Sequence, residues 1–185
     1  MKVPATAFLS FIGLAAAWPA FADDQRGFNR LGANLVGYEE TPLTLSTTGN
    51  GRFDALIRND ETEVVYRLSY NDLEGDVQQA HIHLGQRATS GGIVVFLCTN
   101  LGNGPAGLQG SQACPPPPAT ISGTITAVDV TPNAQAISQG IAASDFAVLV
   151  RAIRAGATYV NGHTAKYPGG EIRDQIGRGS SQSHH

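Results

Sequence analysis

Three histidines are spaced so that they could bind one metal ion. His81 and His83 stand two residues apart in the segment Ala80-His-Ile-His-Leu-Gly85, and His163 follows much later in the chain. Residues two apart in a β-strand point to the same side, so His81 and His83 are expected to share one face. Neutral imidazole nitrogens suit both copper and zinc. The set predicts a metal site, with copper as the expected ion and zinc as the alternative. Hydrogen-bonded histidines without any metal are the competing interpretation.

Four further side chains lie near His163 in the sequence and could support such a site: Tyr159, Tyr167, Glu171 and Arg173. Glu171 could be a fourth ligand or accept an imidazole N–H, and a pair with Arg173 or with a residue of another strand is the simpler alternative. Arg173 could attract an anion, although a paired arginine is the commoner use of that residue on a sheet. For the two tyrosines, packing is the ordinary role and redox chemistry the rarer one.

Alternating apolar residues predict the strands that would position these side chains. Ala80, Ile82 and Leu84 are expected to enter the core and to leave both imidazoles of the His-x-His pair outside it. Pro168-Gly-Gly170 is typical of a reversal between two strands. The predicted strands cover residues 31–36, 52–57, 64–70, 77–84, 93–98, 119–128, 159–163 and 171–176. These segments predict an all-β sandwich.

One stretch follows a helical period instead. Apolar residues recur at helical spacing between Phe146 and Ile153, with Ser144 as the expected N-cap and Gly156 as the expected end. We therefore expect one short helix.

The two cysteines are expected to form a disulfide. Between Cys98 and Cys114 lie 15 residues rich in Gly and Pro, and neither cysteine belongs to a C-x-x-C pair. Closing a loop of this size stabilises a protein by roughly 3 kcal/mol on the chain-entropy model. Disulfides persist in oxidising compartments, so this expectation depends on export.

The N-terminus predicts export. Residues 1–22 combine Lys2, an apolar run and the small-x-small sequence Ala20-Phe-Ala22, which is typical of a signal peptide cleaved after Ala22. The protein would then be secreted or periplasmic, and no later apolar run is long enough to span a bilayer. We expect a single domain over residues 23–177 and a flexible tail over residues 178–185, which contains His184 and His185.

The net charge and the composition limit the classes of partner that this protein is expected to bind. The formal net charge is −3, and losing Lys2 with the signal peptide would make it about −4. This balance argues against nucleic acid and leaves a metal ion or another exported protein as partner. The 22 Gly and 10 Pro residues fit short strands joined by turns.

Several motifs together resemble the CHRD domain, which is named for chordin and is found in exported bacterial proteins. The matching segments are Gly37-x-Glu39-x-Thr41-Pro42, Ala80-His-Ile-His-Leu-Gly85, Gly91-Gly-Ile-Val-Val95, Tyr159-Val-Asn-x-His163-Thr and Pro168-Gly-Gly-Glu-Ile-Arg173. The resemblance implies an immunoglobulin-like or Greek-key β-sandwich, in agreement with the strand pattern. It implies little about activity.

A looser similarity is to copper/zinc superoxide dismutase, which has a His-x-His copper pair, a later copper histidine and a nearby arginine. Three hypotheses follow. The chain is an exported copper-binding protein, a metal-free extracellular interaction module, or a redox enzyme in which Arg173 guides an anion. Fold alone does not decide among them.

Overall fold

The computed structural model describes residues 29–105 and 112–179. The predicted signal peptide, residues 1–22, and residues 180–185 of the predicted tail lie outside the described residues. Within the described ranges, no helix is both long enough and apolar enough to cross a membrane.

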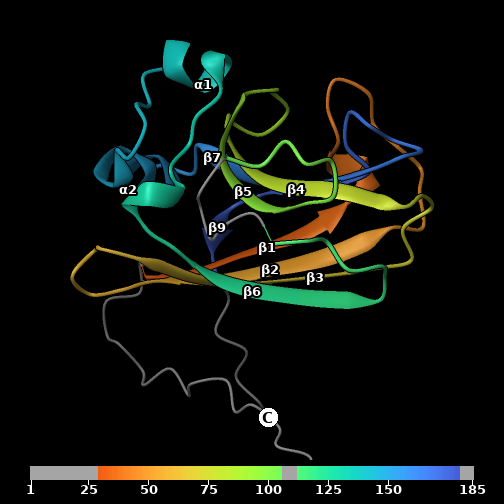
Figure 1. The fold of residues 1–185 in the computed structure, drawn as a ribbon. Helices are drawn as coiled ribbons and strands as arrows, with labels where there is room; N and C mark the ends of the chain where they lie inside the picture. Colours follow the sequence, from red (N-terminus) through yellow and green to blue (C-terminus); the bar gives the residue numbers. More distant parts are fainter. Residues whose placement is uncertain (1–28, 106–111, 180–185) are drawn as a thin grey trace, which may run out of the picture.

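The described residues form nine antiparallel strands in one continuous sheet that folds into two layers (Figure 1). The strand order is β5-β4-β7-β8-β1-β2-β3-β6, and the short β9 pairs with β1. Strands β1, β2, β3 and β6 make the lower layer in the figure, and β4, β5 and β7 make the upper one. The strands are β1 (Arg30–Val36), β2 (Asn50–Ile57), β3 (Val64–Asn71), β4 (Val77–Leu84), β5 (Gly92–Thr99), β6 (Ala119–Ile125), β7 (Thr158–Thr164), β8 (Ile172–Gln175) and β9 (Gly177–Arg178). The predicted all-β fold is confirmed.

Alternate residues of the strands fill one hydrophobic core. In β3, Val64, Tyr66, Leu68 and Tyr70 are buried, while the residues between them are more exposed. Fully burying one large apolar side chain contributes about 1.5–3 kcal/mol, so this alternation fixes which face of each strand turns inward. The core members include Phe53, Leu68, Ile82, Leu97 and Val160, all at most 1% exposed.

Helix α2 (Phe146–Arg154) is the predicted helix, and it buries Phe146, Leu149, Val150 and Ile153. The expected cap was wrong. Ser144 adopts a left-handed backbone with φ 61°, and the Asp145 side chain accepts the Val148 N–H instead. The short helix α1 (Ala134–Ser138) and the 3-10 turns η1 (Gly37–Glu39) and η2 (Ala127–Asp129) were not predicted.

The bounds of several predicted segments differ from the structure, most of them by one or two residues. The strand expected over 119–128 ends at Ile125, because residues 127–129 form η2 and the Asp129 side chain accepts the Thr126 N–H. Arg178, the first residue of the expected tail, pairs with Leu31 of β1. Backbone pairing therefore extends the ordered sheet to the start of the predicted tail.

Cys98 and Cys114 form the predicted disulfide. Both are buried, and Asn100 supports the bridge by bonding to the Cys114 backbone through both its amide and its carbonyl side-chain atoms. The bond ties the segment after β5 back onto that strand. A buried disulfide of this kind indicates an oxidising compartment.

Candidate metal centre

Strands β4 and β7 place the three histidines on one face of the upper layer. The antiparallel ladder pairs His81 with Asn161 and His83 with Tyr159. Directly opposed residues share a face, and His163 lies two residues beyond Asn161 on that same face. His163 is thus the diagonal neighbour of His81, which is why two distant parts of the sequence meet here.

The imidazoles are buried, contrary to the expectation that they would stay outside the core. Ala80 and Ile82 turn inward as predicted, but His81 is also 0% exposed and His83 and His163 are each 7% exposed. The reason is that loops cover the outer side of the layer. The strand period predicts which way a side chain points, but it carries no information about what later covers that side.

The ring nitrogens of the three histidines converge. His81 Nδ1 lies 3.3 Å from His163 Nε2, and one ligand nitrogen from each of the three rings lies within 4.8 Å of the others. Two nitrogens bound to one zinc at about 2.0–2.1 Å are at most about 4 Å apart. Small rotations of the rings would therefore bring all three nitrogens onto a single ion.

Hydrogen bonds to backbone carbonyls determine which nitrogens carry protons. His83 Nδ1 lies 3.0 Å from Gly91 O, and His163 Nδ1 lies 3.1 Å from Pro168 O. A carbonyl oxygen only accepts, so each Nδ1 donates, and a neutral imidazole then presents its lone pair at Nε2. Such outer hydrogen bonds fix the tautomer of metal-binding histidines in general.

Within the part of the chain that the structure describes, one of the three imidazole lone pairs has a partner and two have none. His163 Nε2 accepts, so His81 Nδ1 donates across their 3.3 Å contact and the His81 lone pair is left at Nε2. The Nε2 atoms of both His81 and His83 are buried, and neither has a hydrogen-bond partner among residues 29–105 and 112–179. A buried acceptor in that condition costs about 1–3 kcal/mol.

Burial keeps all three rings neutral. Removal from water, together with the neighbouring His163 and His83, lowers the pKa of His81 from 6.5 to about 2. Burial lowers the pKa of His83 to about 3, although its bond to Gly91 works in the opposite direction. The pKa of His163 is lowered by burial as well. Neutral imidazole is the form that binds a metal ion.

Aromatic rings and one guanidinium pack against the histidines. Tyr159 stacks on His83 with ring centroids 4.7 Å apart and 4° between the planes. The guanidinium carbon of Arg173 lies 3.6 Å from the centroid of the Tyr159 ring. Phe96 meets His81 edge to face at 4.4 Å. Of the four predicted supporting residues, Tyr159 contacts a histidine directly and Arg173 stacks behind Tyr159.

Gly91 locks the loop that covers His83. Its N–H donates to the Tyr159 hydroxyl at 3.1 Å, and its carbonyl accepts from His83. A Cβ at this position would lie 1.6 Å from Leu84 O, so no other residue fits without moving the loop. The glycine thus permits the close approach that fixes the orientation of His83.

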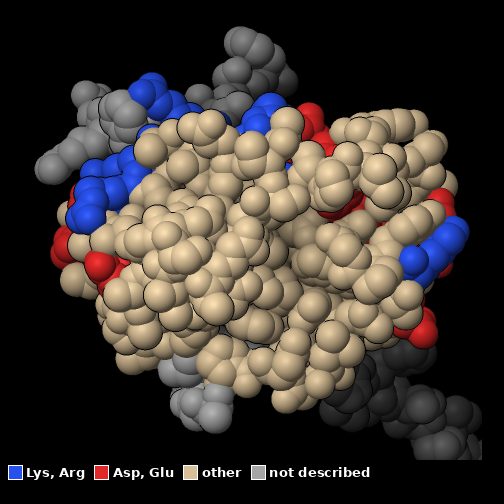
Figure 2. Space-filling model, turned by 90° about the horizontal axis from the view of Figure 1, so that it is seen from above, with Lys and Arg blue, Asp and Glu red and all other residues tan. Residues whose placement is uncertain are grey.

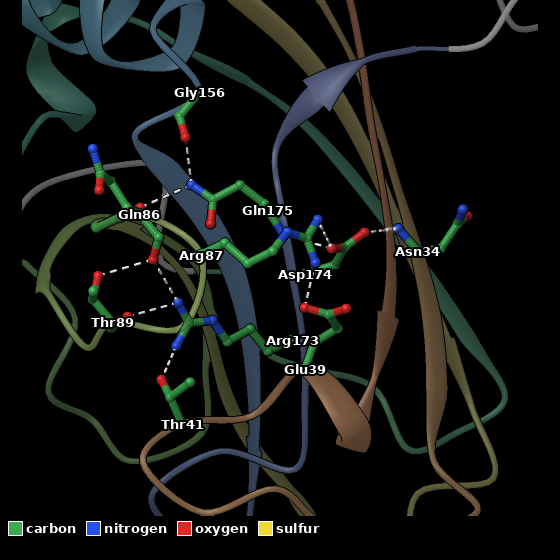
Figure 3. A network of polar contacts seen from close by, with 11 residues as sticks. Asn34, Glu39, Thr41, Gln86, Arg87, Thr89, Gly156, Arg173, Asp174 and Gln175 are labelled. Carbon is green, nitrogen blue, oxygen red and sulfur yellow. Dashed lines mark hydrogen bonds and ion pairs between the residues drawn. The ribbon is translucent and has the colours of Figure 1, made fainter.

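Arg173 is held by loops rather than left open to solvent (Figure 3). The guanidinium donates to the hydroxyl of Thr41 and to the carbonyls of Gln86 and Thr89, and the residue is 3% exposed. A group that attracts anions from solution needs an exposed charge. The predicted role in guiding an anion therefore finds no support in this geometry.

Glu171 and Tyr167 lie outside the histidine cluster. The carboxylate of Glu171 is 0% exposed and accepts from Thr47, the Glu74 backbone N–H and Thr164 at 2.7–2.8 Å. None of these donors is an imidazole, and none is Arg173. The Tyr167 hydroxyl donates to the Glu74 carboxylate on the outer side of the turn. Both residues brace the hairpin between β7 and β8.

Glu40 is a buried residue near the site that the sequence did not single out. It is 5% exposed and accepts from Asn161 Nδ2 at 2.6 Å. Burial raises the pKa of Glu40 to about 7, against the opposing effects of Asn161 and Arg173. Gly170, with φ 130°, makes room, since a Cβ there would lie 2.6 Å from a Glu40 oxygen. In the sequence, Glu40 lies in the segment before Pro42. That segment has the pattern of an ordinary turn and does not indicate a site residue.

The comparisons identify the domain but no individual relative. The family model described as the CHRD domain matches residues 31–176, which include all three histidines and most of the described sheet. No curated protein and no solved structure matches the chain. The matched range covers well over half of the sequence, and the chain belongs to the CHRD domain family.

Proposed function

We propose that this chain is an exported copper-binding protein whose ligands are His81, His83 and His163. The observation that carries the proposal is that the buried Nε2 atoms of His81 and His83 find no partner in the described part of the chain, while their rings cluster with that of His163. Buried polar atoms in native proteins almost always have a partner, and an exception calls for an explanation such as an ion. A metal ion bound among the three rings would give such a lone pair a partner.

The ligand set favours copper. Structural zinc sites nearly always use four protein ligands, often with thiolates. Here the described residues offer three imidazoles, and no cysteine or carboxylate joins the cluster. Copper(II) is the tightest binder in the divalent series for a given nitrogen site, and imidazole suits it. Three histidines would leave a coordination position for metal transfer or for another ligand.

Export is part of the same proposal. The disulfide between Cys98 and Cys114 supports an oxidising compartment, and the pattern of residues 1–22 supports a cleaved signal peptide. Mass spectrometry of the protein recovered from cells tests the cleavage directly. We expect a mature N-terminus at Asp23.

Metal analysis of untagged protein tests the ligands. We expect about one copper ion per chain after dialysis against copper at equal concentration, and strongly reduced copper in His81→Ala, His83→Ala and His163→Ala. A double variant, His184→Ala with His185→Ala, is the matched control because those histidines could bind copper adventitiously. Copper content that follows the control variant rather than the three proposed ligands would overturn the proposal.

One observation favours a second function, a metal-free interaction module. His83 and His163 each tie a covering loop through a bond from Nδ1 to a carbonyl, of Gly91 and Pro168 respectively. In that case the histidines would only hold loops that contact another exported protein. The alternative predicts unchanged loops and stability when copper is added, and it leaves the two Nε2 lone pairs unexplained.

A further inference from the structure

We propose that the site formed by His81, His83 and His163 selects monovalent copper over divalent ions, and that the Arg173 side chain stacked behind Tyr159 contributes to this selection. The inference rests on the proposed function and names the charge of the ion that the site takes. It follows from the charges, the burial and the number of ligands around the three rings.

The ligands supply no negative charge. All three candidate ligands are neutral imidazoles, and within residues 29–105 and 112–179 no carboxylate or cysteine sulfur belongs to the cluster. A divalent ion bound here would keep its full charge of +2. The idealised cost of burying an ion rises with the square of its charge, so a divalent ion costs about four times as much as a monovalent one.

The buried carboxylates of Glu40 and Glu171 are hydrogen-bonded to other groups. Glu40 reaches the histidine strand only through Asn161, whose Nδ2 donates to it at 2.6 Å. Glu171 accepts from Thr47, Thr164 and the Glu74 N–H. Neither side chain contacts an imidazole through any of these bonds, so neither offsets the second charge of a divalent ion at short range.

The guanidinium of Arg173 places a buried positive charge behind the stacked rings of His83 and Tyr159. His83, Tyr159 and Arg173 form a continuous column, with 4.7 Å between the first two rings and 3.6 Å from the guanidinium carbon to the tyrosine ring. Charges interact more strongly across a poorly solvated interior than in water. Arg173 is 3% exposed, so its positive charge lies in such an interior and disfavours further positive charge at the rings stacked on it.

The surface above the layer adds few charges. Figure 2 views the molecule from above, and the middle of this face is mostly free of charged side chains, with Lys, Arg, Asp and Glu concentrated toward the rim. Phe96 and Tyr159 place aromatic rings directly against the histidines. These surroundings offer few negative charges to offset the second positive charge of a divalent ion.

The number of ligands also favours monovalent copper. Copper(II) prefers a square-planar or tetragonal set of nitrogen and oxygen ligands, and zinc prefers four ligands in a tetrahedron. Three imidazoles from two adjacent strands, packed between Phe96 and Tyr159, offer a three-coordinate site. Monovalent copper, with its closed d shell, is satisfied by three nitrogens.

Arg173 also positions His83 by a second route. It donates to the carbonyls of Gln86 and Thr89 in the loop that ends at Gly91, and the Gly91 carbonyl holds His83 Nδ1. Arg173 is therefore a positioning residue that acts through Tyr159 and the loop. It does not contact the ion.

Competition titrations test the selectivity on the untagged protein. A chromophoric chelator for Cu(I) gives that affinity under anaerobic conditions, and separate titrations give the affinities for Cu(II) and Zn(II). We expect Cu(I) to bind at least ~100-fold more tightly than either divalent ion. Equal or tighter binding of Cu(II) or Zn(II) would overturn this inference and leave the metal-binding proposal standing. The absence of binding by all three ions would overturn both.

Arg173→Gln and Arg173→Lys separate charge from packing. The glutamine removes the positive charge, so we expect the ratio of Cu(I) to Cu(II) affinity to fall about tenfold, which lowers the midpoint potential of the bound copper by about 59 mV. The lysine keeps the charge and should hold the potential closer to that of the unaltered protein. Arg52→Gln, on β2 of the other layer, controls for overall charge. An unchanged potential in folded Arg173→Gln would contradict the contribution of Arg173 to the selection of monovalent copper. If that variant does not fold, the titrations with the three ions still decide the selectivity.

Discussion

The Nδ1 atom of His81 lies 3.3 Å from the Nε2 atom of His163, although 82 positions separate the two residues in the sequence. This contact is a hydrogen bond, and it uses the lone pair that His163 would give to a metal. Binding an ion must therefore replace the bond. A metal-bound state of the site would differ from a metal-free state in this contact.

The first prediction concerns the loop over His83. Gly91→Ala places a Cβ 1.6 Å from Leu84 O, so the loop must move and the bond from His83 to the Gly91 carbonyl is lost. We expect the free energy of unfolding to fall by more than ~2 kcal/mol in urea denaturation. Gly169→Ala is the matched control, because a Cβ there meets nothing within 4 Å. Equal effects of the two substitutions would contradict the assigned role of Gly91.

A second prediction concerns pH. His81 and His83 have folded-state pKa values of about 2 and about 3, below their ordinary value of 6.5. Between these values the unfolded chain binds more protons, so the metal-free protein loses stability as pH falls below 6.5. Glu40 works in the opposite direction between its ordinary pKa of 4.5 and its raised value of about 7, but it accounts for one proton against two or more.

Urea denaturation in the presence of a chelator measures this slope. We expect a loss of about 1 kcal/mol or more per pH unit between pH 6 and pH 5. The loss should shrink when His81 and His83 are both replaced by Ala. Stability that stays constant or rises over this interval would show that the rings are not buried neutral groups.

The third prediction isolates Glu40. The raised pKa means that the folded protein holds a proton at Glu40 between pH 4.5 and about pH 7, so this residue lowers stability as pH rises through that range. Glu40→Gln removes the titration while retaining an oxygen that can accept from Asn161. The variant should therefore show less loss of stability between pH 6 and pH 8 than the unaltered protein, as measured by urea denaturation. An identical pH profile would mean that Glu40 is ionised throughout.

Much of the sheet could be predicted from the sequence because its strands follow the two-residue period closely. In β4, the alternation of Ala80 and Ile82 with His81 and His83 predicted the inward and outward faces correctly. The burial of the imidazoles could not be predicted, since it depends on how the loop that follows β4 and ends at Gly91, and the turn at Pro168, fold over that face.

The residues around the histidines could be predicted only in part, because some of their contacts join distant parts of the chain. Tyr159 lies one strand period from Asn161 and two from His163, so its place on the histidine face follows from the sequence pattern. Glu40 reaches Asn161 from a turn 121 positions earlier, and no local pattern marks such a contact. Glu171 is near His163 in the sequence, but the reversal after Pro168 turns its carboxylate toward Thr47 and Thr164.

The disulfide supplies a fourth prediction. Replacing both Cys98 and Cys114 by Ala opens the loop that they close, and on the chain-entropy model this lowers the free energy of unfolding by roughly 3 kcal/mol. Chemical denaturation of the double variant measures the loss. Reduction of the unaltered protein with a thiol should give a similar loss, and an effect below ~1 kcal/mol in both experiments would mean that the loop is already ordered without the bond.

The central claim is that His81, His83 and His163 bind copper in the folded state, and thermal melting of the untagged protein with and without copper tests it most directly. A ligand at 100 times its dissociation constant stabilises the folded state by about 2.7 kcal/mol, which should raise the melting temperature by at least ~5 °C in a protein of this size. Measurements with Cu(II) and, under anaerobic reducing conditions, with Cu(I) cover both oxidation states. The account predicts that the rise persists when His184 and His185 are replaced by Ala and disappears when His81, His83 and His163 are replaced. No rise with either ion, or a rise of the same size in the triple variant, would contradict it.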